Sequence, residues 1–375
     1  MLYYAYTYLI TYIYIHRSGF SLKQIAQERQ YFFLSQFYRW GGTTTFTAHL
    51  LNSLGKETIL LVESPYQQDK KKGNFGYGLQ YQTVPTGFLD RIDNPFIVDF
   101  FRYNHVLSKL KRDDITIVIH DPTEISKENQ SYLKYWNIIC IRKAMQQYLR
   151  ERYDVNSKFL YHPFYPYPID TNNNCDNLGK DSDCGPYEDS RHEKKDVVSI
   201  SRVDYGKNTE IIMEANALLQ KGQGGTDKNC NSGSTIKIHG PFDLQYVNTM
   251  LGGKENFMQY YYGTFKKSFG AISRILNKAK FVVDLSLIHH DGGGTQYTFL
   301  EAIYHNAALI INRNWIEKVD KKHRDFEEGY NCFAASNGKE LAEIIKNSEN
   351  TDIEKVVRNS KKLLHRHINA NWSSV

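Results

Sequence analysis

The sequence predicts an α/β protein of two doubly wound, Rossmann-like domains that face each other across a cleft. Short apolar runs with strand character alternate with helical patterns in both halves of the chain, and a glycine turn follows an apolar run in each half. A polar stretch almost free of aliphatic residues separates the halves. The length of 375 residues suits two domains, and a hydrophobic content of 41% is sufficient for their cores.

These patterns divide the chain into five segments. We expect an N-terminal extension, a first Rossmann-like domain, a polar insertion, a second Rossmann-like domain and a C-terminal helix, with bounds at 1–30, 31–168, 169–196, 197–352 and 353–375. The extension contains an apolar stretch, Leu2–Ile15, that is too short for a membrane span and lacks a basic flank. An extra β-strand or an extension that packs nowhere explains this stretch better than an interfacial anchor.

The first half begins with a strand, a glycine turn, a helix and a second strand. The aromatic run Tyr31–Phe37 predicts the strand, and the glycines Gly41 and Gly42 follow it. Helical spacing of apolar residues then predicts a helix over Thr43–Leu54. Ligands of such folds bind at the carboxyl ends of the strands, so both glycines are candidate site residues. The other predicted elements of this half are strands at Thr58–Val62, Ile115–Ile119 (followed by His120) and Trp136–Ile141, and a helix at Lys143–Arg152.

The second half contains a similar unit with more glycine. The strand pattern Phe281–Leu287 leads to three glycines, Gly292 to Gly294, and a helical pattern that carries Glu301 follows before the strand pattern Ala307–Asn312. This order presents backbone N–H groups at a helix N-terminus, which suits a phosphate or diphosphate. A carboxylate further along the helix can accept hydrogen bonds from ribose or sugar hydroxyls. The segment therefore predicts a nucleotide-sugar site.

Two cations stand at the start of the same half. The strand pattern Val197–Ser201 ends at Arg202, and Lys207 follows it just before the helical pattern Ile211–Leu219. An arginine fork and a mobile lysine on either side of such a turn can bind a diphosphate. The pair alone is weak evidence, because Arg and Lys commonly lie on the surface near strand ends. Together with the glycine loop it favours a phosphate site.

The charge pattern indicates which classes of partner the protein is expected to bind. Net charge is +6, from 47 basic and 41 acidic residues, and no RNA-binding signature is present, so we expect no nucleic-acid partner. Solvated faces explain the scattered basic runs better than peripheral attraction to anionic lipid or phosphorylated substrates, and membrane contact stays open as the alternative. The runs are Lys70–Lys72, Lys266–Lys267 and Lys321–Arg324.

The cysteines indicate a reducing compartment. Five cysteines are scattered without CxxC or metal-ligand spacing, which favours a cytoplasmic protein, although Cys175 and Cys184 share a polar loop and can pair under oxidising conditions. His289 and His290 form no metal set either. We therefore expect no metal site.

The motifs in order resemble group 1 glycosyltransferases of the GT-B fold, which use nucleotide sugars and are mostly retaining. SRVDYGKNTEIIMEA followed by DGGGTQYTFLEAIYHNAALIIN is similar to the carboxyl half of that family. WGGTTTFTAHLLNSLGKETILLV resembles its opening strand, glycine turn and helix, and IICIRKAMQQYLRERY with KFLYHPFYP resembles the crossing between its domains. The resemblance covers roughly residues 31–372. It implies an amino-terminal domain on the acceptor side, a carboxy-terminal domain that binds the donor, and a final helix that crosses back.

The resemblance also implies roles for single residues. Arg202 and Lys207 would hold the donor diphosphate in place of a metal ion, and Glu301 matches the family's ribose-binding glutamate. His120 lies where relatives often contact the transferred sugar. The backbone of Gly293, Gly294, Thr295 and Gln296 would bind the phosphates or the sugar, and Gly41 and Gly42 would line the cleft from the other side.

One position departs from the family pattern. Many relatives have a second glutamate eight residues before the position of Glu301, where this chain has Gly293, and Asp291 is the nearby residue that could replace it.

We expect a retaining, metal-independent and cofactor-free transfer of a sugar from a nucleotide diphosphate sugar to a hydroxyl of a glycan, lipid or small molecule. The alternative is a non-catalytic nucleotide- or glycan-binding protein on a degraded scaffold. A dinucleotide oxidoreductase is less well supported, because the glycine loop lacks GxGxxG.

Overall fold

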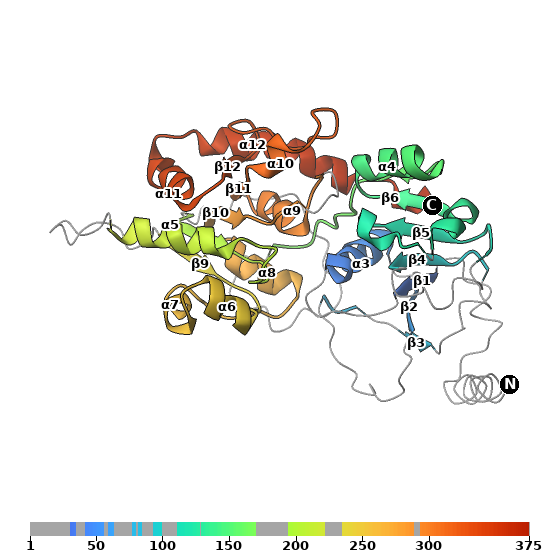
Figure 1. Ribbon diagram of the computed structural model, residues 1–375, viewed down its shortest axis with the longest axis horizontal. Helices are drawn as coiled ribbons and strands as arrows, with labels where there is room; N and C mark the ends of the chain where they lie inside the picture. The colour runs from blue at the N-terminus through green and yellow to red at the C-terminus, as the bar shows by residue number, and fades with distance from the viewer. Residues whose placement is uncertain are drawn as a thin grey trace. The chain divides into compact units, whose positions relative to one another are not determined.

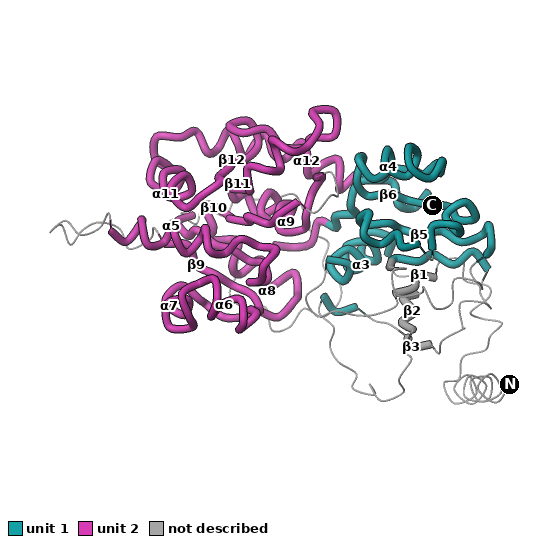
Figure 2. The backbone as a smooth tube through the Cα atoms, in the orientation of Figure 1, with its two compact units in different colours: residues 1–165, 370–375 teal, residues 166–369 magenta. Residues whose placement is uncertain are grey.

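The computed structural model divides the chain into two compact units, one formed by Met1–Tyr165 with Ala370–Val375 and the other by Pro166–Asn369 (Figure 2). No helix in the described part of the chain has the length and apolar character needed to cross a bilayer. Residues 1–30 and most of the polar insertion lie outside the described residues. The structure describes 42–55, 77–79, 93–98, 111–127, 129–169, 194–221, 235–288 and 293–374, and the backbone alone at 31–34, 59–63, 82–84 and 99.

The first unit is built on a seven-stranded sheet in which every neighbouring pair is parallel (Figure 1). The strand order is β3-β2-β1-β4-β5-β6-β7, so the chain reverses its direction across the sheet between β1 and β4. The elements are β1 (Tyr31–Leu34), α3 (Gly42–Leu54), β2 (Ile59–Glu63), β3 (Gln82–Val84), β4 (Phe96–Asp99), β5 (Thr116–Ile119), β6 (Asn137–Cys140), α4 (Lys143–Tyr153), β7 (Lys158–Phe159) and short 3-10 turns at Pro122–Glu124, Gln130–Tyr135 and Trp372–Ser374.

The C-terminal residues of the chain complete the core of the first unit. Trp372 is 4% exposed, and its indole Nε1 donates a hydrogen bond to the carbonyl of Tyr161 at 2.9 Å. Its ring packs edge-on against Phe46 of α3 at 5.4 Å between centroids. A second cluster lies on the strands and α4, formed by Ile97, Ile117, Ile119, Ile138, Met145 and Leu149 among others.

The second unit contains a five-stranded parallel sheet with the order β12-β11-β10-β8-β9. The chain adds β9 on one side of β8 and then β10 on the other, so it reverses between β8 and β10. The elements are β8 (Asp196–Ser199), α5 (Thr209–Lys221), β9 (Ile236–Ile238), α6 (Leu244–Met250), α7 (Lys254–Met258), α8 (Phe269–Leu276), β10 (Ala279–Asp284), α9 (Tyr297–Tyr304), β11 (Ala308–Asn312), α10 (Asn314–Glu317), β12 (Phe333–Ala335), α11 (Gly338–Lys346), a 3-10 turn (Asn347–Glu349) and α12 (Ile353–Ile368).

Helices pack on this sheet through apolar side chains, with α5 against α11 and α12 against α9 and β11 (Figure 1). Four of the helices begin at a side-chain cap: Asp243, Ser268, Asn337 and Asp352 each accept a hydrogen bond from a backbone N–H of the first turn. Helix α9, like α7 and α10, begins without a side-chain cap, because Gln296 supplies none.

The predicted fold class is confirmed in both halves. The predicted strands and helices occur within a few residues of their expected bounds, and the elements β3, β4, β7, β12, α6, α7, α8, α10 and α11 are additional. The C-terminal helix α12 belongs to the second unit as far as Asn369, and the chain enters the first unit at Ala370.

Candidate functional site

The candidate site of the second unit lies at the carboxyl ends of β8 and β10. The loop with Arg202 and Lys207 follows β8, and the glycine loop follows β10. The backbone N–H of Leu287 donates to the carbonyl of Gly206 at 3.0 Å, so the two loops are in contact. Doubly wound sheets bind ligands where the strand order reverses, and these strands flank that reversal.

Lys207 is held against the loop that follows β10. Its Nζ donates a hydrogen bond to Ser286 Oγ at 2.6 Å, and the Ser286 hydroxyl donates to the buried carboxylate of Asp284. The neighbouring Asn208 side chain donates to the carbonyl of Leu285 at 3.1 Å. Ser286 was not predicted as a site residue, although a hydroxyl two residues after a buried strand was the available signal.

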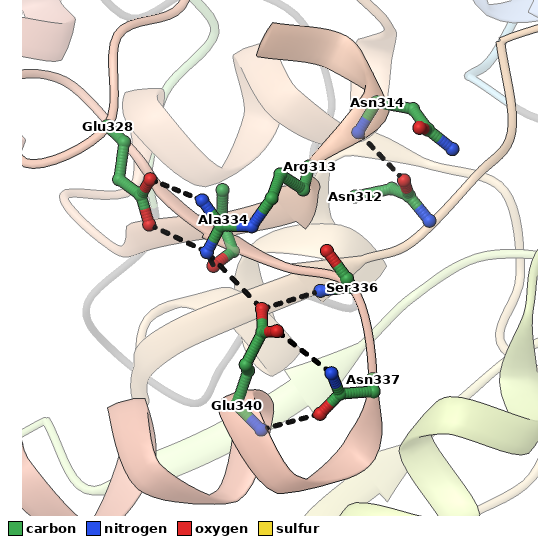
Figure 3. Close-up of polar contacts among 8 residues, drawn as sticks. All are labelled: Asn312, Arg313, Asn314, Glu328, Ala334, Ser336, Asn337 and Glu340. Carbon is green, nitrogen blue, oxygen red and sulfur yellow. Dashed lines mark hydrogen bonds and ion pairs between the residues drawn. The ribbon is translucent and has the colours of Figure 1, made fainter. Parts of the chain in front are cut away.

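Arg202 presents its guanidinium to solvent. Its side chain is 55% exposed, and Nε lies 3.4 Å from Oδ2 of Asp204. Arg313, at the carboxyl end of β11, provides a contrast. Glu328 holds its guanidinium with two hydrogen bonds of 2.6 and 3.1 Å and raises its pKa, and the Ala334 carbonyl and Glu340 also accept from it (Figure 3). Arg202 is therefore better placed than Arg313 to bind an anion.

The glycine loop adopts a backbone that favours glycine. Gly293 and Gly294 have φ of +82° and +101°. A Cβ atom at Gly293 would lie 2.6 Å from Cγ2 of Val319, so this backbone has no room for a glutamate side chain at that position. Thr295 is buried, and its hydroxyl pairs with His367 Nε2 at 3.1 Å. Asp291 and Gly292 lie outside the described residues.

Glu301 of α9 is buried and paired. It is 2% exposed, and Oε2 accepts a hydrogen bond from the hydroxyl of Tyr167. His305 Nδ1 lies 2.8 Å from the Glu301 carbonyl and 3.9 Å from Oε2. A carbonyl only accepts, so Nδ1 carries the proton and Nε2 accepts from Ser273 Oγ at 2.9 Å. Burial lowers the pKa of His305, which favours this neutral form.

A third cation, Lys267, lies within electrostatic range of both Arg202 and Glu301. Burial, and then the charge of Arg202, lower the pKa of Lys267 to about 7, while Glu301 acts in the opposite direction. Its neighbour Lys266 is exposed. The sequence predicts a solvated run for both lysines, because a local pattern does not distinguish them.

The first unit carries the remaining candidates. Gly42 is the exposed first residue of α3, and Gly41 lies outside the described residues. His120 follows β5 as expected, and its Nε2 donates to the carbonyl of Val98 at 2.7 Å, so Nδ1 is the acceptor nitrogen. Burial lowers the pKa of His120 to about 4, which keeps the ring neutral at physiological pH.

No group of His, Cys, Asp or Glu that could hold a metal ion occurs among the residues that the structure describes. The described cysteines, Cys140 and Cys332, are buried free thiols whose pKa burial raises to about 12.

Solved structures share this architecture at low sequence identity. HepE (Alr3699) of Anabaena, crystallised with UDP and glucose, is 13% identical and superposes with a TM-score of 0.61 over 90% of this chain and 95% of that one. An α-glucosyltransferase in complex with UDP-glucose and DNA containing an abasic site gives 0.55 at 12% identity over 90% and 95%. A glycosyltransferase of Rickettsia africae gives 0.52 at 13% over 92% and 94%.

These neighbours define the class of the fold: the chain has the GT-B fold of nucleotide-sugar glycosyltransferases, as the sequence motifs indicated. No protein-family model and no curated protein sequence matches the chain.

Proposed function

We propose that the protein is a glycosyltransferase that moves a sugar from a nucleotide diphosphate sugar to a hydroxyl group of an acceptor. One observation carries the proposal: two cations after β8 and a glycine loop after β10 meet at the reversal of the strand order, with Glu301 on the helix that the glycine loop begins. This combination offers positive charge and backbone N–H groups for a diphosphate and a carboxylate for sugar hydroxyls.

In the proposed reaction the cations stabilise the departing nucleotide. Negative charge develops on the diphosphate as the bond to the sugar breaks, and Lys207 is already fixed beside the glycine loop through Ser286. The exposed guanidinium of Arg202 can bind the same phosphates in a forked geometry. We propose that these charges act in place of a metal ion and that the transferred sugar keeps its anomeric configuration.

The glycine loop and α9 would bind the rest of the donor. Because Gln296 adds no side-chain cap, a phosphate or sugar oxygen is a suitable acceptor for the first turn of α9. We propose that Gly293, Gly294, Thr295 and Gln296 bind it through their backbone, that Glu301 binds the ribose, and that Gly41, Gly42, Asp291 and His120 complete the donor and sugar contacts.

UDP-sugars are the first donors to test. HepE and the α-glucosyltransferase, which share the fold, were crystallised with UDP and glucose or with UDP-glucose. At 12–14% identity this likeness is a reason to choose a ligand. Acceptors would be glycans, lipid-linked sugars or small molecules with a free hydroxyl.

The lack of a glutamate at position 293 favours one alternative, a non-catalytic binding protein. The steric limit at Gly293 means that a donor-sugar contact from that position is absent, which a non-catalytic binding protein on the same scaffold would tolerate. Turnover separates this alternative from the transferase, because both should bind nucleotide.

The test has two parts. Thermal unfolding of the full chain is measured with UDP, GDP and ADP, and the nucleotide that raises the midpoint identifies the base. Release of that nucleotide from a panel of its sugars is then measured with and without acceptors. Acceptor-dependent release that falls strongly in Lys207→Ala supports the transferase. Stabilisation by a nucleotide without turnover of any donor supports the binding protein, and no stabilisation by any nucleotide contradicts the proposed donor site.

A further inference from the structure

Tyr167 is held on the second unit by ring contacts with two helices and by its backbone carbonyl. The ring stacks on Phe269 of α8 with centroids 4.2 Å apart and an interplanar angle of 23°. It also meets the ring of Tyr304 of α9 edge-on at 4.9 Å, and the Tyr304 hydroxyl donates to the Tyr167 carbonyl. Tyr167 is 2% exposed. Its hydroxyl is thereby directed to one place.

That place is the carboxylate of Glu301. The Tyr167 hydroxyl donates to Oε2, a contact between residues 134 positions apart. An ionised carboxylate accepts only, and it has about four acceptor positions on its two oxygens. The bond from Tyr167 to Oε2 therefore restricts the orientation of the carboxylate.

We propose that Tyr167 is a positioning residue that orients Glu301 toward the ribose hydroxyls of the nucleotide and so determines the preference for a ribonucleotide. The proposal rests on the proposed function, because it assigns Glu301 to the ribose. Hydrogen bonds to a carboxylate are strong when the geometry is fixed in advance, and a site built for hydroxyls disfavours an analogue that lacks them. Without the Tyr167 hydroxyl the carboxylate can rotate, and the ribose loses its directed acceptor.

The experiment compares two ligands in the full-length protein. Dissociation constants are measured by calorimetry for UDP and for 2′,3′-dideoxy-UDP, with GDP and ADP and their dideoxy forms if UDP does not bind. Loss of hydroxyl bonds to a carboxylate should weaken the wild-type affinity for the dideoxy form about tenfold to a hundredfold. Tyr167→Phe should bring this ratio below about threefold, with the affinity for the dideoxy form little changed.

Tyr246→Phe is the matched control. Tyr246 is also a buried tyrosine of this unit whose hydroxyl donates to a carboxylate, that of Glu210. This variant should keep the wild-type ratio, even if it unfolds at a lower temperature. Glu301→Gln should lower the ratio as Tyr167→Phe does, and the double variant should lower it no further.

The outcomes distinguish the two proposals. If Tyr167→Phe keeps the wild-type ratio, or weakens both ligands equally, Tyr167 is only structural and the inference is wrong while the donor site stands. If the wild type binds both forms equally, the assignment of Glu301 to the ribose is wrong, and the inference is wrong with it. If no nucleoside diphosphate binds the wild type, the proposed function fails as well.

Discussion

Gly293 and Val319 are packed so closely that a Cβ atom at position 293 would lie 2.6 Å from Cγ2 of Val319. The φ of Gly293 is +82°, a backbone conformation that costs a residue with a side chain about 1–3 kcal/mol. Both effects fix the path of the loop that follows β10. They also disfavour a glutamate, or any other residue with a side chain, at this position.

We expect Gly293→Ala to destabilise the second unit by about 2–6 kcal/mol, the sum of backbone strain and a steric clash. Gly329→Ala is the control, because Gly329 has a φ of +73° in the same unit but nothing within 4 Å of an added Cβ. Gly329→Ala should lower the free energy of unfolding only by the cost of the backbone strain. Urea unfolding measures the loss of stability in both variants. Adding Val319→Ala to Gly293→Ala should remove the part of this loss that comes from the steric clash. Equal costs at the two glycines would contradict the clash.

Lys207→Ala should reduce nucleotide affinity and turnover about a hundredfold, because a preorganised charge that faces the diphosphate is lost. Ser286→Ala should reduce them about threefold to tenfold, since Lys207 then loses one hydrogen bond at 2.6 Å but keeps its charge. Lys237→Ala is the control: Lys237 pairs with Asp196 at 2.7 Å in the same unit, outside the proposed site. Steady-state kinetics and calorimetry are the measurements. Similar effects of Lys207→Ala and Lys237→Ala would argue against the site.

Local patterns in the sequence were sufficient for the fold and for the residues at strand ends. Apolar runs followed by glycine or by a cation located the loops after β8 and β10, because parallel sheets place those loops at one edge. A buried carboxylate such as that of Glu301 needs a partner, but the partner, Tyr167, is 134 residues away and no local pattern identifies it. Lys266 and Lys267 are adjacent residues of the same type, so no local pattern distinguishes them. Tertiary packing leaves Lys266 exposed and Lys267 partly buried.

His120→Asn should lower turnover and leave nucleotide binding by the second unit unchanged, if His120 contacts the transferred sugar. Its pKa of about 4 in the folded chain lies below the ordinary value of 6.5, so the unfolded chain binds a proton first as the pH falls. The unfolding free energy of the wild type should therefore decrease as the pH falls from about 6.5 to 4. His120→Asn should make this dependence on pH less steep. Urea unfolding across this range measures it, with exposed His365→Asn as the control for loss of one histidine. An unchanged slope in His120→Asn would show that the ring is not held neutral.

Nucleotide binding should be coupled to proton uptake by Lys267. In the free protein burial and Arg202 lower its pKa to about 7, and Glu301, whose Oε2 lies 3.9 Å from His305 Nδ1, acts in the opposite direction. A bound diphosphate adds negative charge and raises this pKa, so affinity should fall as the pH rises above 7. The terminal phosphate has a second pKa of about 6, so measurements at pH 8 separate its titration from that of the lysine.

Calorimetry of the full chain in two buffers that differ in ionisation enthalpy gives the number of protons taken up. We expect uptake of a substantial fraction of one proton at pH 8 in the wild type and in the control Lys266→Met, whose lysine is exposed. Lys267→Met should take up no proton, and its affinity for nucleotide should not decline above pH 7. It should also bind nucleotide more weakly at pH 7 because one positive charge is missing. Equal proton uptake in Lys267→Met and the wild type would assign the titration to another group.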